Sequence, residues 1–198
     1  KDYVAYQRNY FISYPANVMV MRFSADRAGM QNLVFSYAPN SISQGSLSGD
    51  GDKGLVFSAF LNNNGMKYVV RIQAETKGGT LSNTGCRLTV KGADEVVFYV
   101  TADTDYKMNF NPDFKDPKTY VGVDPAETTC QWINNAVMQG YTALFQQHYS
   151  DYAALFNRVR LNLNPTVKTS DIPAPQRLKN YRNGQPDCYL EELYYQFG

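Results

Sequence analysis

Hydrophobic and polar positions alternate along the first half of the chain, which predicts antiparallel β-strands. The segment VMVMRFSA (18–25) is apolar on both faces over its first half, as expected for a strand inside a sandwich. It follows VAYQRNYFISY (4–14) across the turn-forming residues 15–17, so a hairpin is expected. Further strands are expected at NLVFSYA, LVFSAFL, KYVVRIQAE, CRLTVKG and EVVFYVTADT, with Gly, Asn and Asp between them. Seven such strands predict an antiparallel β-sandwich.

Near residue 110 the spacing of apolar residues changes to that of a helix. Asp124 is a candidate N-cap, Pro125 suits the first helical position, and Glu127 follows three residues after the cap. An amphipathic path of about eight turns then begins, kinked or broken at Gly140. The positions on this path are Ala126, Cys130, Ile133, Val137, Tyr141, Leu144, His148, Tyr152 and Leu155.

The last forty residues contain several short segments. RVRLNLN (158–164) alternates like a return strand, and the proline-punctuated stretch 165–175 is expected to be a linker. PQRLKNYRNG (175–184) predicts a short helix stopped by Gly184. A final helix is expected over 187–198, with Asp187 as its N-cap. Its apolar stripe consists of Leu190, Leu193, Tyr194 and Phe197.

Composition excludes several classes of partner. The hydrophobic content of 43% and charged content of 19% fit a packed globular protein. The net charge is +1 and the basic residues are scattered, so no nucleic-acid partner is expected. No stretch approaches the roughly 18 apolar residues of a membrane span, so no membrane partner is expected. The 16 tyrosines suit sheets, and they also suit surfaces that bind sugars or proteins.

The three cysteines are Cys86, Cys130 and Cys188, and they form no Cys-x-x-Cys spacing. We expect three buried or partly buried thiols with at most one disulfide. No Gly-rich phosphate loop or metal-ligand cluster is present, so no cofactor is expected.

The single histidine is the first candidate for chemistry. His148 precedes Asp151 and Tyr152 by three and four residues, within reach on a helix. A His–Asp pair could serve acid–base catalysis, but no nucleophile motif accompanies it. A core or interdomain histidine with a satisfied ring nitrogen is the favoured interpretation.

Two acidic pairs are weaker candidates. Asp50 and Asp52 alternate as in a calcium loop, but the twelfth position is Leu61, so a solvated hairpin tip is favoured. Asp103 and Asp105 end a strand and could lie at the separation that glycoside hydrolysis requires. No general acid is identifiable beside them, and a catalytic role is not expected.

Aromatic residues also gather on the first strand. They alternate imperfectly, so about half could face solvent and form a sugar-stacking platform, although packing inside the sandwich is the favoured interpretation. They are Tyr3, Tyr6, Tyr10, Phe11 and Tyr14.

Four stretches, in order, resemble glycoside hydrolase family 95, the α-L-fucosidases that act on terminal α-1,2-linked fucose. They are YQRNYFISYPANVMVMRFSAD, LTVKGADEVVFYVTADTDY, GYTALFQQHYSDYAALFNRVRLNL and IPAPQRLKNYRNGQPDCYLEELYYQFG. The most specific positions are His148, Asp151, Tyr152, Leu155, Phe156, Arg158 and Val159, with Leu190, Leu193, Tyr194, Phe197 and Gly198 at the end. The chain departs from the family's LPTDERL-like stretch, because Pro175 and Gln176 occur where an acidic residue is usual.

The resemblance implies a β-sandwich, a helical linker, a catalytic (α/α)6 barrel and a C-terminal β domain. The fold is then mainly β with a helical extension: residues 1–110 belong to the sandwich, 111–170 to a helical linker with a return strand, and 171–198 to a short helix and the first barrel helix. The family's general acid glutamate, and the Asn and Asp that activate water for inversion, lie in the barrel and match no position here. Catalytic residues are therefore expected outside this segment.

In this interpretation the segment is structural, and its partners are the missing barrel of the same protein and, through the parent enzyme, an oligosaccharide substrate. Related members also act on α-L-galactosides. A periplasmic or extracellular location is expected because the family is commonly exported. The candidate interface residues are His148, Asp151, Tyr152, Leu190, Leu193, Tyr194 and Phe197.

Two other functions stay open: a stand-alone carbohydrate-binding module, and a self-sufficient hydrolase that uses Asp103, Asp105 or His148. We also expect the final helix to be poorly ordered or to contact a neighbouring molecule, since exposed apolar stripes bind partners. A packed intramolecular environment for Leu193 and Phe197 would contradict the proposed truncation.

Overall fold

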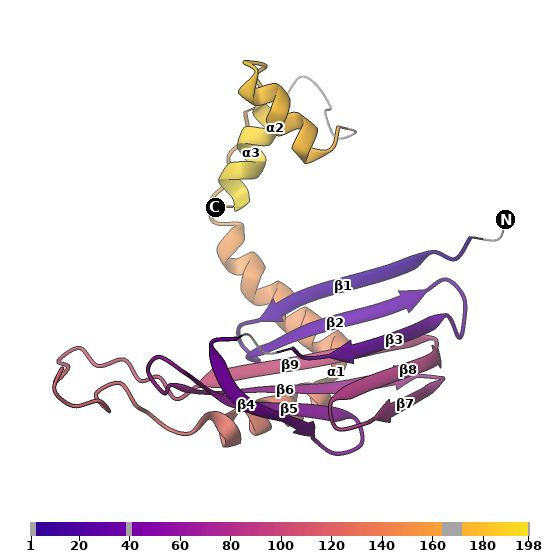
Figure 1. Cartoon of the computed structure of the whole chain (residues 1–198). Coiled ribbons are helices and arrows are strands. Elements are labelled where there is room, and N and C mark those ends of the chain that lie inside the picture. Colours follow the sequence, from indigo (N-terminus) through magenta and orange to yellow (C-terminus); the bar gives the residue numbers. More distant parts are fainter. Residues whose placement is uncertain (1–2, 39–40, 164–171, 198) are drawn as a thin grey trace. The chain divides into compact units, whose positions relative to one another are not determined.

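The computed structural model describes residues 3–38, 41–163 and 172–197. Over these residues the chain forms nine strands and three helices (Figure 1). It divides into two compact units, residues 1–151 and residues 152–198, which we describe separately.

The first unit is built on two antiparallel sheets. The larger has the strand order β1-β2-β9-β6-β5-β4, and the smaller has the order β3-β8-β7. The strands are β1 (Tyr6–Ser13), β2 (Val18–Ala25), β3 (Gln31–Ser36), β4 (Ser43–Gly49), β5 (Gly54–Leu61), β6 (Lys67–Lys77), β7 (Thr80–Asn83), β8 (Arg87–Ala93) and β9 (Glu95–Thr104).

All seven expected strands are present, and the predicted sandwich is confirmed. Two further strands, β4 and β7, were not predicted. Their sequences, SQGSLSG and TLSN, contain a single β-branched residue, Thr80, and no aromatic residue, so they lack the composition that marks strands. Each lies at the edge of its sheet, where backbone pairing with β5 or β8 determines its conformation.

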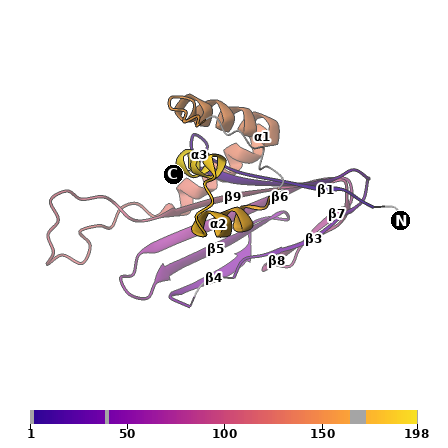
Figure 2. The ribbon, with the colours of Figure 1, turned by 90° about the horizontal axis from the view of Figure 1, so that it is seen from above.

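Side-chain alternation on the central strand β9 gives each face of the larger sheet its own core. Val96 and Phe98 pack towards the smaller sheet, whereas Val97 and Tyr99 pack towards α1 (Pro125–Phe156). In Figure 2, α1 lies on one side of β9 and β6, and β3 and β8 lie on the other. The unit therefore has three layers: small sheet, large sheet and helix.

Helix α1 begins and bends where the sequence predicts. Asp124 Oδ1 accepts a hydrogen bond from the backbone N–H of Ala126 at 3.0 Å, and Pro125 is the first helical residue. The backbone of Gly140 has φ 74° and ψ 168°, so α1 is two helical segments joined at a kink. Only glycine adopts this region without appreciable strain, which explains its presence there.

Packing of the first-strand tyrosines inside the sandwich was the favoured interpretation, and it is wrong. Tyr6 and Tyr10 share the β1 face that looks towards the smaller sheet, but both are exposed. The smaller sheet has three strands against six and leaves this edge uncovered. Only Phe11, which points to the α1 side, is buried. Tyr3 and Tyr14, outside the strand, are exposed as well.

The second unit contains α2 (Ala174–Arg182) and α3 (Cys188–Phe197), close to their predicted bounds. The expected return strand is wrong for its described part: residues 158–163 have no strand structure. Alternation alone does not make a strand without an adjacent sheet edge to pair with. Residue 164, most of the predicted linker, the 170/171 boundary and Gly198 lie outside the described residues.

Candidate functional site

Helix α1 packs on the larger sheet, and this contact holds the candidate residues on both elements in place. Thr101 Oγ1 donates a hydrogen bond to the carbonyl of Thr129 at 3.2 Å, and both residues are buried. Around this bond lies a cluster made by strands β1, β2 and β9 and both segments of α1. Its buried members are Phe11, Val18, Val20, Val97, Tyr99, Ile133, Ala136 and Leu144.

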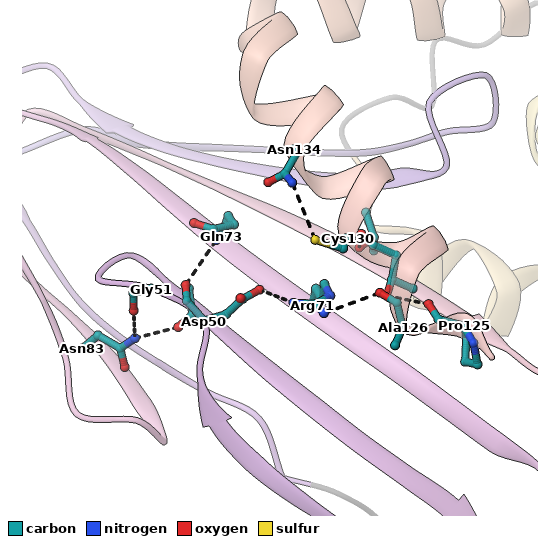
Figure 3. A network of polar contacts seen from close by, with 12 residues as sticks. Asp50, Gly51, Arg71, Gln73, Asn83, Pro125, Ala126, Cys130 and Asn134 are labelled. Atoms are coloured by element: carbon teal, nitrogen blue, oxygen red, sulfur yellow. Dashed lines mark hydrogen bonds and ion pairs between the residues drawn. The ribbon is translucent and has the colours of Figure 1, made fainter.

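Figure 3 shows the polar network that ties the start of α1 to the sheet. Arg71 Nη1 forms an ion pair with Asp50 Oδ2 at 2.6 Å, and Arg71 Nη2 donates to the carbonyl of Ala126 at 3.5 Å. Gln73 Nε2 donates to the Asp50 carbonyl at 3.3 Å. Asp50 is thus a structural anchor at the β4–β5 turn, and Asp52 beside it is exposed.

The candidate histidine packs on the sandwich. The ring of His148 stacks on Phe11 with the centroids 5.0 Å apart. Asp151, half-buried, is the last residue of the first unit, and Tyr152, the first of the second, stacks on Phe156 at 5.2 Å. The stacking gives His148 a packing role, in agreement with the favoured interpretation.

The two carboxylates at the end of β9 serve the backbone. Asp105 is 6% exposed, and its Oδ1 accepts the N–H of Lys67 at 2.9 Å. Its carbonyl accepts the N–H of Gly122 at 2.6 Å. Asp103 Oδ1 accepts the N–H of Thr104 at 2.8 Å. Because Asp105 is buried and already bonded, the pair does not offer the two accessible carboxyls that glycoside hydrolysis requires.

The cysteines are free thiols. Cys130 and Cys188 are half-buried as expected, but Cys86 is exposed, so the expectation that all three are buried or partly buried is wrong for that residue. It lies in the turn between β7 and β8, where the chain is solvated. The described residues contain no group of three or more His, Cys, Asp or Glu side chains arranged to hold a metal ion. None of the described helices is long and apolar enough to cross a membrane.

Several of the interface candidates are strongly exposed apolar side chains. On α3, Tyr194 is 81% and Phe197 is 91% exposed, and Leu193 is also exposed. We call these three residues the α3 face. Residues 156–162 and α3 line a groove of about 760 Å³ that includes Leu193. The described residues therefore provide no packed environment for Leu193 or Phe197.

An ion pair that the sequence did not suggest holds α3 to α2. Arg177 is 4% exposed, and its Nε and Nη2 donate to Asp187 Oδ2 and Oδ1 at 2.8 and 2.5 Å. Asp187 Oδ1 also caps α3 by accepting the N–H of Leu190 at 2.9 Å. Arg177 holds the pKa of Asp187 below its usual value. The guanidinium further stacks on Tyr189, 4.4 Å from the ring centroid.

A polar cleft between the larger sheet and α1 was also not predicted from the sequence. It holds about 320 Å³ and brings together Glu75, Glu95, Tyr99 and Tyr141. These residues come from β6, β9 and α1, so no spacing along the sequence marks them. The register of β6 on β9, which places Glu75 opposite Val97, is the only signal that could have done so.

Comparison with known proteins identifies both parts of the chain. Residues 1–109 match the model of the glycosyl hydrolase family 65 N-terminal domain, and residues 140–198 match that of the glycosyl hydrolase family 95 catalytic domain. The second match begins at the kink of α1 and so includes residues 140–170, which the sequence analysis assigned to the linker.

Curated relatives agree with this. The chain is 32% identical to a "Probable alpha-fucosidase A" of Aspergillus niger over 97% of this chain and 24% of that protein. It is 32% identical to "Alpha-L-fucosidase 2" of Arabidopsis thaliana over 80% of this chain and 17% of that protein. Among solved structures, a "Putative kojibiose phosphorylase from human microbiome" is similar with a TM-score of 0.47 and 7% identity, over 77% of this chain and 21% of that one.

The chain spans less than a quarter of the length of either curated relative. Its match to the family 95 domain confirms the resemblance seen in the sequence. The chain therefore belongs to the glycosyl hydrolases through its family 65-type N-terminal domain, and its residues 140–198 match the family 95 catalytic domain.

Proposed function

We propose that this chain is the non-catalytic front part of an α-L-fucosidase-like hydrolase that removes terminal α-L-fucosyl residues with inversion. The sandwich and α1 form a rigid support, and the α3 face packs into the remainder of the catalytic domain. The names of the curated relatives support the substrate class. Because the family that the sequence resembles is commonly exported, we also propose that the parent protein meets its oligosaccharide outside the cytoplasm.

The exposure of the α3 face carries this proposal. A phenylalanine that leaves water contributes about 1.5–3 kcal/mol, so a helix that presents Phe197 at 91% exposure forgoes a large gain. This helix lies in the segment that matches a catalytic domain. A partner surface from the same domain would bury the stripe. The hydrogen bond between Asp105 and the backbone N–H of Lys67 adds support, because it leaves Asp103 and Asp105 unsuited to act as a catalytic pair.

A paired assay tests the catalytic part of the proposal. The 198-residue chain and a longer chain with a whole family 95 domain are incubated with an α-1,2-fucosylated oligosaccharide, and free fucose is measured. The longer chain should release fucose and the 198-residue chain should not. Release by the 198-residue chain would refute the proposal, and D103N and H148A would then locate the activity.

A substitution pair tests the packing role. In the longer chain, Phe197→Asp should lower the melting temperature and the fucose-releasing activity, because it places a charge in an apolar interface. Tyr195→Asp is the matched control, since Tyr195 is an exposed aromatic on the same helix but off the stripe. Equal effects of the two substitutions would show that α3 does not pack through this face.

A further inference from the structure

The cleft beside Tyr141 contains two carboxylates on the same face of the sheet. In the β6–β9 ladder Glu75 lies opposite Val97, and Lys77 lies opposite Glu95. Residues two apart on a strand share a face, so both glutamates project towards the α1 side. They are diagonal cross-strand neighbours, a relation that separates Cα atoms by about 7–8 Å. The cleft volume of about 320 Å³ lies at the lower end of the range for small-molecule sites.

Each carboxylate is held by one donor from inside the protein. The hydroxyl of Tyr99, a fully buried residue, donates to Glu75 Oε2 at 2.7 Å. Arg22 Nη2 donates to Glu95 Oε2 at 2.5 Å. Among the described residues, the Oε1 atom of neither glutamate has a hydrogen-bond partner. The two side chains are therefore fixed in place with accepting capacity left over.

The aromatic wall of the cleft is also fixed. The Arg22 guanidinium lies 4.8 Å from the centroid of the Tyr141 ring. Asn9 Nδ2 donates to the Tyr141 hydroxyl at 3.1 Å, and Phe11 contacts the ring edge-on at 5.8 Å. Phe145 lies nearly parallel to the same ring with the centroids 6.1 Å apart, so Tyr141 is a fixed wall of the cleft. A fixed wall beside two oriented acceptors is a binding arrangement with little ordering cost.

Charge indicates the kind of ligand. Glu75 and Glu95 contribute two negative charges, and Arg22 and Lys77 contribute two positive charges. A site with no net charge favours a neutral ligand over an ion. Carboxylates accept hydrogen bonds, and the Lys77 ammonium donates them, so the ligand needs several hydroxyl groups. A neutral pyranose meets these requirements, because its hydroxyls both donate and accept hydrogen bonds.

We propose that this cleft is a saccharide subsite that binds one neutral sugar residue, with Glu75 and Glu95 accepting hydrogen bonds from its hydroxyls, Lys77 donating hydrogen bonds and Tyr141 forming one wall. The site lies within the first unit and does not depend on the hydrolase function proposed above. It also differs from the exposed β1 tyrosines, which lie on the opposite face of the larger sheet.

The test is a titration of the ¹⁵N-labelled 198-residue chain with L-fucose and, separately, D-galactose, followed by amide chemical shifts. At least one sugar should bind saturably with a Kd on the order of millimolar, as suits a single small subsite. The shifts should be largest near Lys77 and Tyr141. Absence of saturable binding by both sugars, or shifts confined to β1, would overturn the proposal.

Variants separate the cleft from other surfaces. E75Q and E95Q should each weaken binding about tenfold or more, since each removes a charged acceptor. E127Q, at an exposed glutamate of α1, should leave the Kd unchanged and is the matched control. K77A changes an exposed residue, and it should weaken binding as well. If Y10A weakens binding and E95Q and K77A do not, the sugar binds the tyrosines of β1 and the proposal fails.

A calcium titration tests whether the two carboxylates bind a cation and not a sugar. The wild-type chain should show no saturable shifts near Lys77 or Tyr141 when Ca²⁺ is added, because Arg22 and Lys77 already balance the two carboxylates. Saturable Ca²⁺ binding that E95Q abolishes would identify a cation site and refute the saccharide proposal.

Discussion

The two units of this chain are stabilised in different ways. In the part of the chain that the structure describes, every buried hydrophobic side chain lies in residues 1–151, and most of them belong to the two cores on either side of the larger sheet. Within the described residues of 152–198, Arg177 is the one buried side chain, and α3 has none. The first unit thus contains its own stabilising core, whereas the second is held by polar contacts and presents its apolar side chains to solvent.

Apolar burial and ion pairs contribute unequally to the free energy of unfolding, so the two units should differ in stability. Burying one large apolar side chain contributes about 1.5–3 kcal/mol, and the first unit buries many. An ion pair contributes little net stability, although removing one partner leaves the other charge unpaired. We therefore expect the second unit to unfold well before the first when the chain is heated.

The largest effect should come from the core between the two sheets. Phe98→Ala removes a ring that is 1% exposed and that contacts Phe23 and Phe35. We expect the free energy of unfolding of the first unit to fall by about 3–5 kcal/mol, measured by urea denaturation with circular dichroism. Phe197→Ala is the matched change in the second unit, and it should alter the urea midpoint hardly at all. A comparable loss from both would show that α3 is packed in this chain.

The intermediate effect should come from the Arg177–Asp187 pair. Asp187→Ala removes both the ion pair and the cap of α3, so we expect a loss on the order of 1–3 kcal/mol confined to α2 and α3. Hydrogen exchange of the α2 and α3 amides measures this. Faster exchange across β9 as well would contradict the independence of the two units.

The same pair predicts a pH dependence. Because Arg177 keeps the pKa of Asp187 below its usual value of 3.8, this carboxylate stabilises the folded state above about pH 4. That stability is lost as the pH falls through the lowered pKa of the folded state. Exchange of the α3 amides should therefore rise on acidification, and the rise should be much smaller in Asp187→Asn.

The smallest effect should come from the corresponding cap in the first unit. Asp124 caps α1 as Asp187 caps α3, but α1 is also held by a buried core. Asp124→Ala should cost about 1 kcal/mol and should leave amide protection around Ile133 intact. A global loss of α1 protection would show that the cap, and not the core, holds this helix to the sheet.

The sequence predicted those strands whose side chains carry the signal. β2, β5, β6 and β9 are rich in valine and phenylalanine, and their pattern records burial on one or both faces. β4 and β7 were not predicted, because their serine, glycine and asparagine residues show no such pattern of buried side chains. The strand predicted at 158–163 is wrong for the opposite reason: its side chains alternate as in a strand, but the segment pairs with no strand.

The candidate sites also divide into those that the sequence predicted and those that it did not. The stacking of His148 on Phe11 agrees with the packing role favoured from the sequence, since an apolar helix path indicates packing. The bonding of Asp105 could not be predicted, because its partner, the N–H of Lys67, is 38 residues away. Arg177 and the Glu75–Glu95 cleft were missed for the same reason, as each depends on contacts between separate elements.

By itself, the sequence determined the local conformations: the strand periods, the Asp–Pro start of α1, the glycine kink and the caps, all set by interactions within a few residues. Only the tertiary structure decided which strand lies at an edge, which tyrosines remain exposed, and which carboxylates meet in a cleft. Those outcomes depend on pairing and packing between residues far apart in the chain, and no local spacing encodes them.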